Sequence, residues 1–98
     1  MSYLVEVLLP VTGDNGRTVT ERVRNELTEA FSGVTMHVNA PAEGLWESEG
    51  DVDRDRIVVV EVMTDELDRQ WWENYRRELE TRLGEDEIVI RAAQVERL

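Results

Sequence analysis

The sequence predicts an α+β fold in which four strands form an antiparallel sheet and two helices cover one face of it. Two patterns carry this prediction: β-forming apolar residues gather in short runs, and two longer stretches repeat apolar residues every three to four positions. Along the chain the order is strand, helix, strand, strand, helix, strand. A chain of 98 residues has room for one hydrophobic core, so we expect residues 1–98 to form a single domain.

The first strand is predicted at residues 3–9, which are rich in β-forming residues and are followed by Pro10. A helix follows, because Thr18 and Glu21 have the spacing of a capping box at the start of an apolar helical repeat. The residues of that repeat are Val19, Val23, Leu27, Ala30 and Phe31. We expect Gly33 to end this helix in a left-handed conformation.

The middle of the chain predicts two strands separated by a long loop. Apolar and polar residues alternate over residues 34–39, as in a strand with one buried face. Residues 40–55 contain both glycine and proline and are predicted to be a loop. The strongest strand pattern is at residues 56–64, and we expect this strand to be central in the sheet.

The last third of the chain predicts a helix and a final strand. Thr64 and Asp65 are expected to cap the helix, and Gly84 is expected to end it. Its apolar stripe consists of Leu67, Trp71, Tyr75, Leu79 and Leu83. This stripe leaves Trp72 on the flank, where a dimer contact or a surface groove could use it. The final strand is predicted at residues 88–95.

This order of elements is the pattern of the ferredoxin-like fold, with a spatial strand order of 4-1-3-2 and one sheet face free of helices. Charged residues indicate the open face, since Glu6, Glu61 and Arg91 should point away from the helices, and His37 should do the same. The apolar residues expected beside them are Leu4, Leu8, Ile57, Val59, Met63 and Val89. Because a monomer would expose this patch, we expect a homodimer that packs through the open face.

The four polar residues of the open face are the candidate catalytic site. We expect His37, Glu61, Glu6 and Arg91 to lie in one row across the sheet. Neighbouring carboxylates disfavour each other's charge, which is a condition for acid–base chemistry. The alternative is that these are surface charges without a role, since about one residue in five of this chain is acidic.

Trp46, in the predicted loop, is the candidate ligand-binding residue, because loop aromatics often close a pocket or meet a partner. The alternative is that Trp46 folds back onto the core. We expect no metal site and no cofactor. His37 is the only histidine, and the acidic run from Asp51 lacks the glycine and the final carboxylate of a calcium loop.

Composition excludes several classes of partner. The chain has 22 acidic residues against 11 arginines and no lysine, so its net charge of −11 disfavours nucleic acid and anionic membranes. The acidity fits either simple solubility or a salt-loving source. No apolar run is long enough to span a membrane, and no cysteine is available for disulfides, so we expect a cytoplasmic protein.

Four segments together resemble a small family of bacterial α+β proteins of unknown function: residues 8–10, 14–16, 31–35 and 41–46. The resemblance runs through most of the chain, but Ser32 stands where that family usually has glycine. The predicted fold also resembles the dimeric α+β barrels, in which two open sheet faces meet around a cavity. That group includes cofactor-independent oxygenases, isomerases and pure binding domains, so the fold does not choose among them.

We therefore expect a cytoplasmic homodimer that binds a small molecule or a protein partner. The first alternative is a small cofactor-independent enzyme of the dimeric α+β barrel type, an isomerase or an oxygenase. In that case His37 or Glu61 would act as the base and Arg91 would hold an anionic group. The second alternative is a structural assembly protein.

Overall fold

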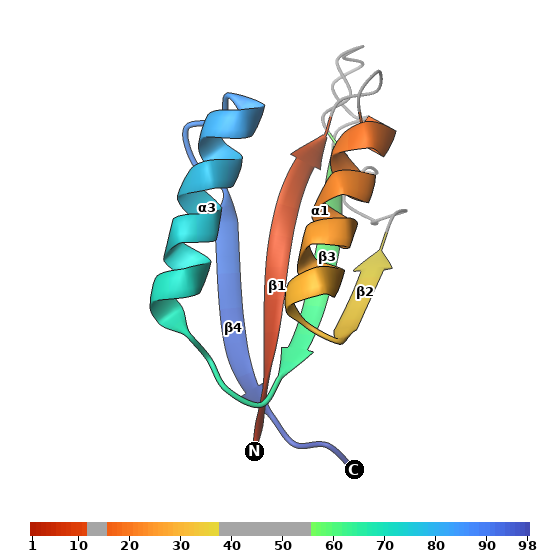
Figure 1. Cartoon of the computed structure of the whole chain (residues 1–98), viewed down its shortest axis with the longest axis vertical. Helices are drawn as coiled ribbons and strands as arrows, with labels where there is room; N and C mark the ends of the chain where they lie inside the picture. The colour runs from red at the N-terminus through yellow and green to blue at the C-terminus, as the bar shows by residue number, and fades with distance from the viewer. Residues whose placement is uncertain (12–15, 38–55) are drawn as a thin grey trace, which may run out of the picture.

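A computed structural model of the chain describes residues 1–11, 16–37 and 56–98. In these residues the chain forms the predicted α+β fold, with four strands and two helices (Figure 1). The elements in order are β1 (Ser2–Val11), α1 (Gly16–Ala30), β2 (Gly33–His37), β3 (Arg56–Thr64), α3 (Arg69–Leu83) and β4 (Val89–Val95).

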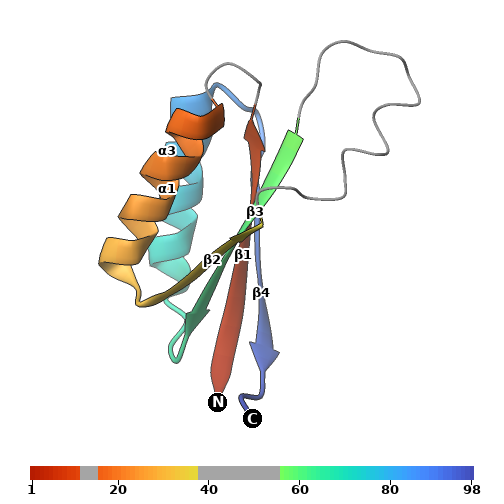
Figure 2. The same ribbon diagram turned by 90° about the vertical axis from the view of Figure 1, so that its right-hand side faces the viewer.

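The strands form one antiparallel sheet in the order β2-β3-β1-β4, which confirms the ferredoxin-like arrangement. The strand formed by residues 56–64 is central, as predicted, and lies between β2 and β1. Figure 2 shows that α1 and α3 both lie on the same side of the sheet. The opposite face therefore carries no helix of the described chain.

The core lies between the sheet and the two helices, and the alternation of the central strands creates it. Every second side chain is buried from Val5 to Val11 in β1 and from Val58 to Val62 in β3, because neighbouring side chains of a strand point to opposite faces. The helices contribute the other half of the core. The buried apolar residues are Val5, Val7, Leu9, Val11, Val23, Leu27, Val58, Val60, Val62, Trp72, Tyr75, Leu79 and Ile88.

The predicted apolar stripe of the second helix is rotated in the structure. Trp72 is buried and Trp71 is only half-buried, so the expectation that Trp72 lies on the flank is wrong. The buried positions are Trp72, Tyr75 and Leu79, which follow helical spacing equally well. Phe31 packs on both indoles: its ring stacks on Trp72 and meets Trp71 edge-on, in each case with centroids 5.1 Å apart.

Three helix ends differ from the sequence prediction. α1 begins at Gly16, so Thr18 lies inside the helix and does not cap it. The N-cap of α3 is Asp68, whose Oδ1 accepts a hydrogen bond from the backbone N–H of Trp71 at 3.1 Å. Thr64 and Asp65 precede this cap and do not serve as it. Gly33 is the first residue of β2 and has no left-handed backbone, so its predicted role as a cap is wrong.

Gly84 ends α3 as predicted. Its backbone is left-handed, with φ 68° and ψ 30°, and its N–H donates to the carbonyl of Thr81. A Cβ at this position would meet no atom within 4 Å, so space is not the reason for glycine. The reason is the positive φ, which costs residues with a Cβ about 1 kcal/mol.

None of the helices in the described ranges is long and apolar enough to cross a membrane.

Gly84 and Gly33 give a matched test of the claim that the positive φ is what requires glycine at position 84. Gly84→Ala should lower the free energy of unfolding by about 1 kcal/mol, because alanine is strained at positive φ. Gly33→Ala should change it by less than about 0.5 kcal/mol, since Gly33 is extended and its added Cβ would make only ordinary contacts. Urea denaturation followed by circular dichroism measures both values. Equal losses in the two variants would contradict the assigned role of Gly84.

Candidate functional site on the open sheet face

The sheet face opposite the helices combines apolar and charged side chains. We call it the open face, and its apolar members are Leu4, Leu8, Ile57, Val59, Met63 and Val89. These positions alternate with the buried core residues of the same strands. Met63 and Val89 are 38% and 45% exposed, although both are large apolar side chains. The predicted apolar patch is therefore present on the described chain.

Strand register brings three of the predicted site residues into one row. Glu6 of β1 lies directly opposite Glu61 of β3 on one side and opposite Arg91 of β4 on the other. The Nε of Arg91 donates to Oε1 of Glu6 at 2.7 Å. Facing carboxylates on adjacent strands repel, and the Arg91 guanidinium offsets that repulsion for Glu6.

The fourth predicted member, His37, does not lie in this row. The residue of β2 opposite Glu61 is Thr35, and His37 lies opposite Val59, two residues before Glu61 in β3. Alternation in the sequence restricts which face a residue joins, but a strand can still slide by two residues without changing faces. The expected alignment of His37 with Glu61 fails for this reason. The catalytic roles of Glu6, Glu61, Arg91 and His37 stay predictions.

Two other predictions concern ligands. Trp46, the predicted ligand-binding residue, lies outside the described residues. Within the described ranges, no three side chains of the types that bind metals are grouped so that they could hold an ion. We call the row formed by Glu6, Glu61 and Arg91 the polar row.

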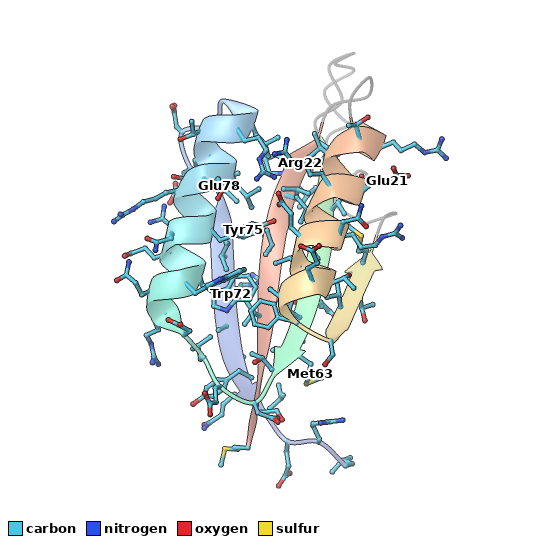
Figure 3. All side chains as sticks on the ribbon, in the orientation of Figure 1. Glu21, Arg22, Met63, Trp72, Tyr75 and Glu78 are labelled. Carbon is cyan, nitrogen blue, oxygen red and sulfur yellow. The ribbon has the colours of Figure 1, made fainter. Side chains whose placement is uncertain are left out.

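A second polar cluster, which the sequence did not predict, joins the two helices. Arg82 of α3 makes a bidentate ion pair with Glu26 of α1, with both N–O distances at 3.0 Å. The Tyr75 hydroxyl donates to Oε1 of Glu26 at 2.8 Å, and Arg82 also contacts Glu78 at 2.7 Å. Figure 3 shows Tyr75 between the two helices. We call Glu26, Tyr75, Glu78 and Arg82 the interhelix cluster.

Ionisation in the interhelix cluster is set by these contacts. Burial opposes the charge of Glu26, but hydrogen bonds from Arg82 and Tyr75 outweigh burial and lower the pKa of this carboxyl. Burial raises the pKa of the Tyr75 hydroxyl, and its hydrogen bond to Glu26 raises that pKa further. Tyr75 is therefore a fixed donor and is unsuited to act as a base. We therefore assign a structural role to the interhelix cluster: it holds α1 and α3 together.

Glu80 ties α3 to the last strand. Its Oε2 accepts from the backbone N–H of Ile88 at 2.9 Å and from Arg76 at 2.9 Å. The hydrogen bond from Ile88, helped by Arg76, lowers the pKa of Glu80. Because Ile88 is a buried core residue, this contact fixes the start of β4 beneath the helix.

Comparison of the chain with protein-family models, with curated proteins and with solved structures finds no match. The resemblance to a small bacterial family therefore stays a prediction, and a functional proposal has to rest on the geometry of this chain.

The interhelix cluster predicts a pH-dependent stability. The pKa of Glu26 is lowered in the folded chain, so its contribution is present above its ordinary pKa of 4.5 and is lost as the pH falls through the lowered value. Glu26→Gln should thus reduce the free energy of unfolding by about 1–2 kcal/mol at pH 7. The deficit relative to the wild type should shrink as the pH falls below 4.5.

Urea denaturation between neutral and acidic pH measures this difference. Glu29→Gln is the control, because Glu29 is exposed on the same helix and its replacement removes the same charge. A deficit for Glu26→Gln that stays constant down to acidic pH would argue against an ionic role.

Proposed function

We propose that this protein is a cytoplasmic homodimer whose open faces pack on each other and form a binding site for a small molecule or a protein partner. The apolar patch of the open face carries the proposal. It extends over three adjacent strands, and no helix or strand of the described chain covers it. Apolar patches of this kind on soluble proteins mark interaction surfaces.

A second copy is the simplest partner for such a surface. In a two-fold dimer the same patch meets itself, so one apolar face supplies both halves of the interface. The polar row supports this arrangement, because it carries both signs of charge. Arg91 is 62% exposed at its side chain and has the reach to face carboxylates of a second copy.

The polar row also supports a binding role between the two faces. Each copy would bring Glu6, Glu61 and Arg91 into a largely apolar contact region, where water is scarce and charge interactions are strong. A ligand with a cationic or hydrogen-donating group would find carboxylates there. The cofactor-independent enzyme is the second candidate, since the facing pair of Glu6 and Glu61 supplies two carboxylates for proton transfer.

A single added charge on the open face tests the dimer. Val89→Glu places a carboxylate on a position that is 45% exposed in the monomer, so the fold should tolerate it, but a dimer would bury it twice. Light scattering should give twice the chain mass of 11.4 kDa for the wild type and the single mass for this variant. Thr28→Glu adds the same charge on exposed α1 and should remain dimeric. A monomeric wild type would overturn the proposal.

Salt should strengthen this dimer. Each chain carries a net charge of −11, so association brings two strongly acidic molecules together. The Debye length, over which charges interact, falls from about 30 Å at 0.01 M salt to about 8 Å at 0.15 M. Added salt therefore weakens the repulsion between the chains, while the apolar contacts persist. Analytical ultracentrifugation should therefore show a dissociation constant that falls as salt is added. Dissociation on adding salt would instead indicate an interface held by ion pairs.

A further inference from the structure

A groove of about 350 Å³ lies on the helix-covered side of the sheet, between α3 and β4. None of the apolar patch of the open face lines it, and Arg91, at the sheet edge, is the residue that it shares with the row of Glu6, Glu61 and Arg91. Its side chains include Leu67, Arg69, Trp72, Arg76, Ile90 and Ala92. One carboxylate, Glu73, also lines it and pairs with Arg77 at 3.6 Å. The groove exists because β4 is an edge strand whose side chains toward α3 are small or only half-buried, so they do not fill the space beneath the helix.

The groove joins an apolar wall to positive charge in a strongly acidic protein. Leu67, Ile90 and Ala92 supply the apolar wall. Arg76 is held near the wall by its ion pair with Glu80 at 2.9 Å. Arg69, in the first turn of α3, has no ion pair within the part of the chain that the structure describes. Arg69 is thus a cation available to a ligand.

Trp72, one of the residues that line the groove, also carries an unmet hydrogen-bond donor. Trp72 is 5% exposed, and its Nε1 is buried with no acceptor among the described residues. Buried donors in folded proteins are nearly always paired, so an unpaired one needs an explanation. Because this nitrogen is shielded from solvent, an acceptor would reach it only by displacing the side chains that cover it.

We propose that this groove binds a small organic carboxylate. The apolar body of the ligand packs against Leu67, Ile90 and the indole of Trp72, and its carboxylate pairs with Arg69 and Arg76. A carboxylate oxygen is also the kind of acceptor that the Trp72 N–H lacks. The volume suits a small ligand, and apolar walls with a few convergent polar groups are typical of such sites.

The net charge of the chain selects a single negative charge over a multiple one. At −11 the protein repels every anion at a distance, and that repulsion grows with the charge of the ligand. The guanidinium of Arg69, with the Glu80-paired Arg76 beside it, offsets the repulsion of one carboxylate more readily than that of a doubly charged phosphate. The apolar wall disfavours a bare inorganic ion, which has no body to bury there.

Phenylacetate is a suitable probe, and the indole N–H of Trp72 is the reporter. The chain has three tryptophans, so ¹⁵N-labelled protein gives few indole signals, and Trp72→Phe identifies the one from Trp72. Adding phenylacetate should shift this signal to a saturating value. Neutral phenylacetamide, which has nearly the same shape, should shift it at least about tenfold less effectively, since the pairing is charge-assisted.

Two arginine variants decide whether the groove is responsible. Arg69→Gln should weaken phenylacetate binding about tenfold, because it removes the available cation of the groove. Arg24→Gln removes the same charge from the exposed surface of α1, away from the groove, and should leave the affinity unchanged. The proposal is overturned if phenylacetate gives no saturable shift of the Trp72 signal. It is equally overturned if Arg69→Gln binds phenylacetate as well as Arg24→Gln does.

Discussion

The pairing of β1 with β3 is the contact on which the rest of the structure depends. It places Val5 opposite Val62 and Val7 opposite Val60, and these four side chains are buried against the helices. The same register places Glu6 opposite Glu61 on the other face. A slip of one residue would turn valines to solvent and carboxylates into the core, so core and polar row are fixed together. The candidate site is in this sense a by-product of correct core packing.

The fold was predictable because its signals are local. Alternation in β1 and β3, helical spacing after Thr18, and the glycine at position 84 each act over a few neighbouring residues. The order of these elements then left few topologies. Gly33 misled the prediction, because a glycine shortly after a helix can be either a cap or simply the first residue of a strand.

For the candidate site, the sequence predicted on which face of the sheet the residues lie, but not which of them lie side by side. The alternation of side chains along the strands assigned Glu6, Glu61 and Arg91 to one face of the sheet, and the structure brings them into one row. The alternation in the sequence could not fix the register of β2 against β3, so Thr35 lies opposite Glu61, where His37 was expected. The ion pair of Glu26 and Arg82 was equally out of reach, since 56 residues separate the partners and only three-dimensional packing makes them neighbours.

The position of β4 at the edge of the sheet has a consequence for how this protein stays dispersed. Its outer edge pairs with no strand in the described chain, and such an edge offers backbone hydrogen bonds to any other strand. Proteins often guard these edges with lysine, which this sequence lacks, and Arg91 is the one charged side chain within β4. In this protein, long-range repulsion between the acidic molecules opposes edge-to-edge pairing instead. The repulsion disappears near the isoelectric point of about 4.4, so acidification removes the barrier to aggregation through the strand edge. The interhelix cluster begins to weaken in the same pH range.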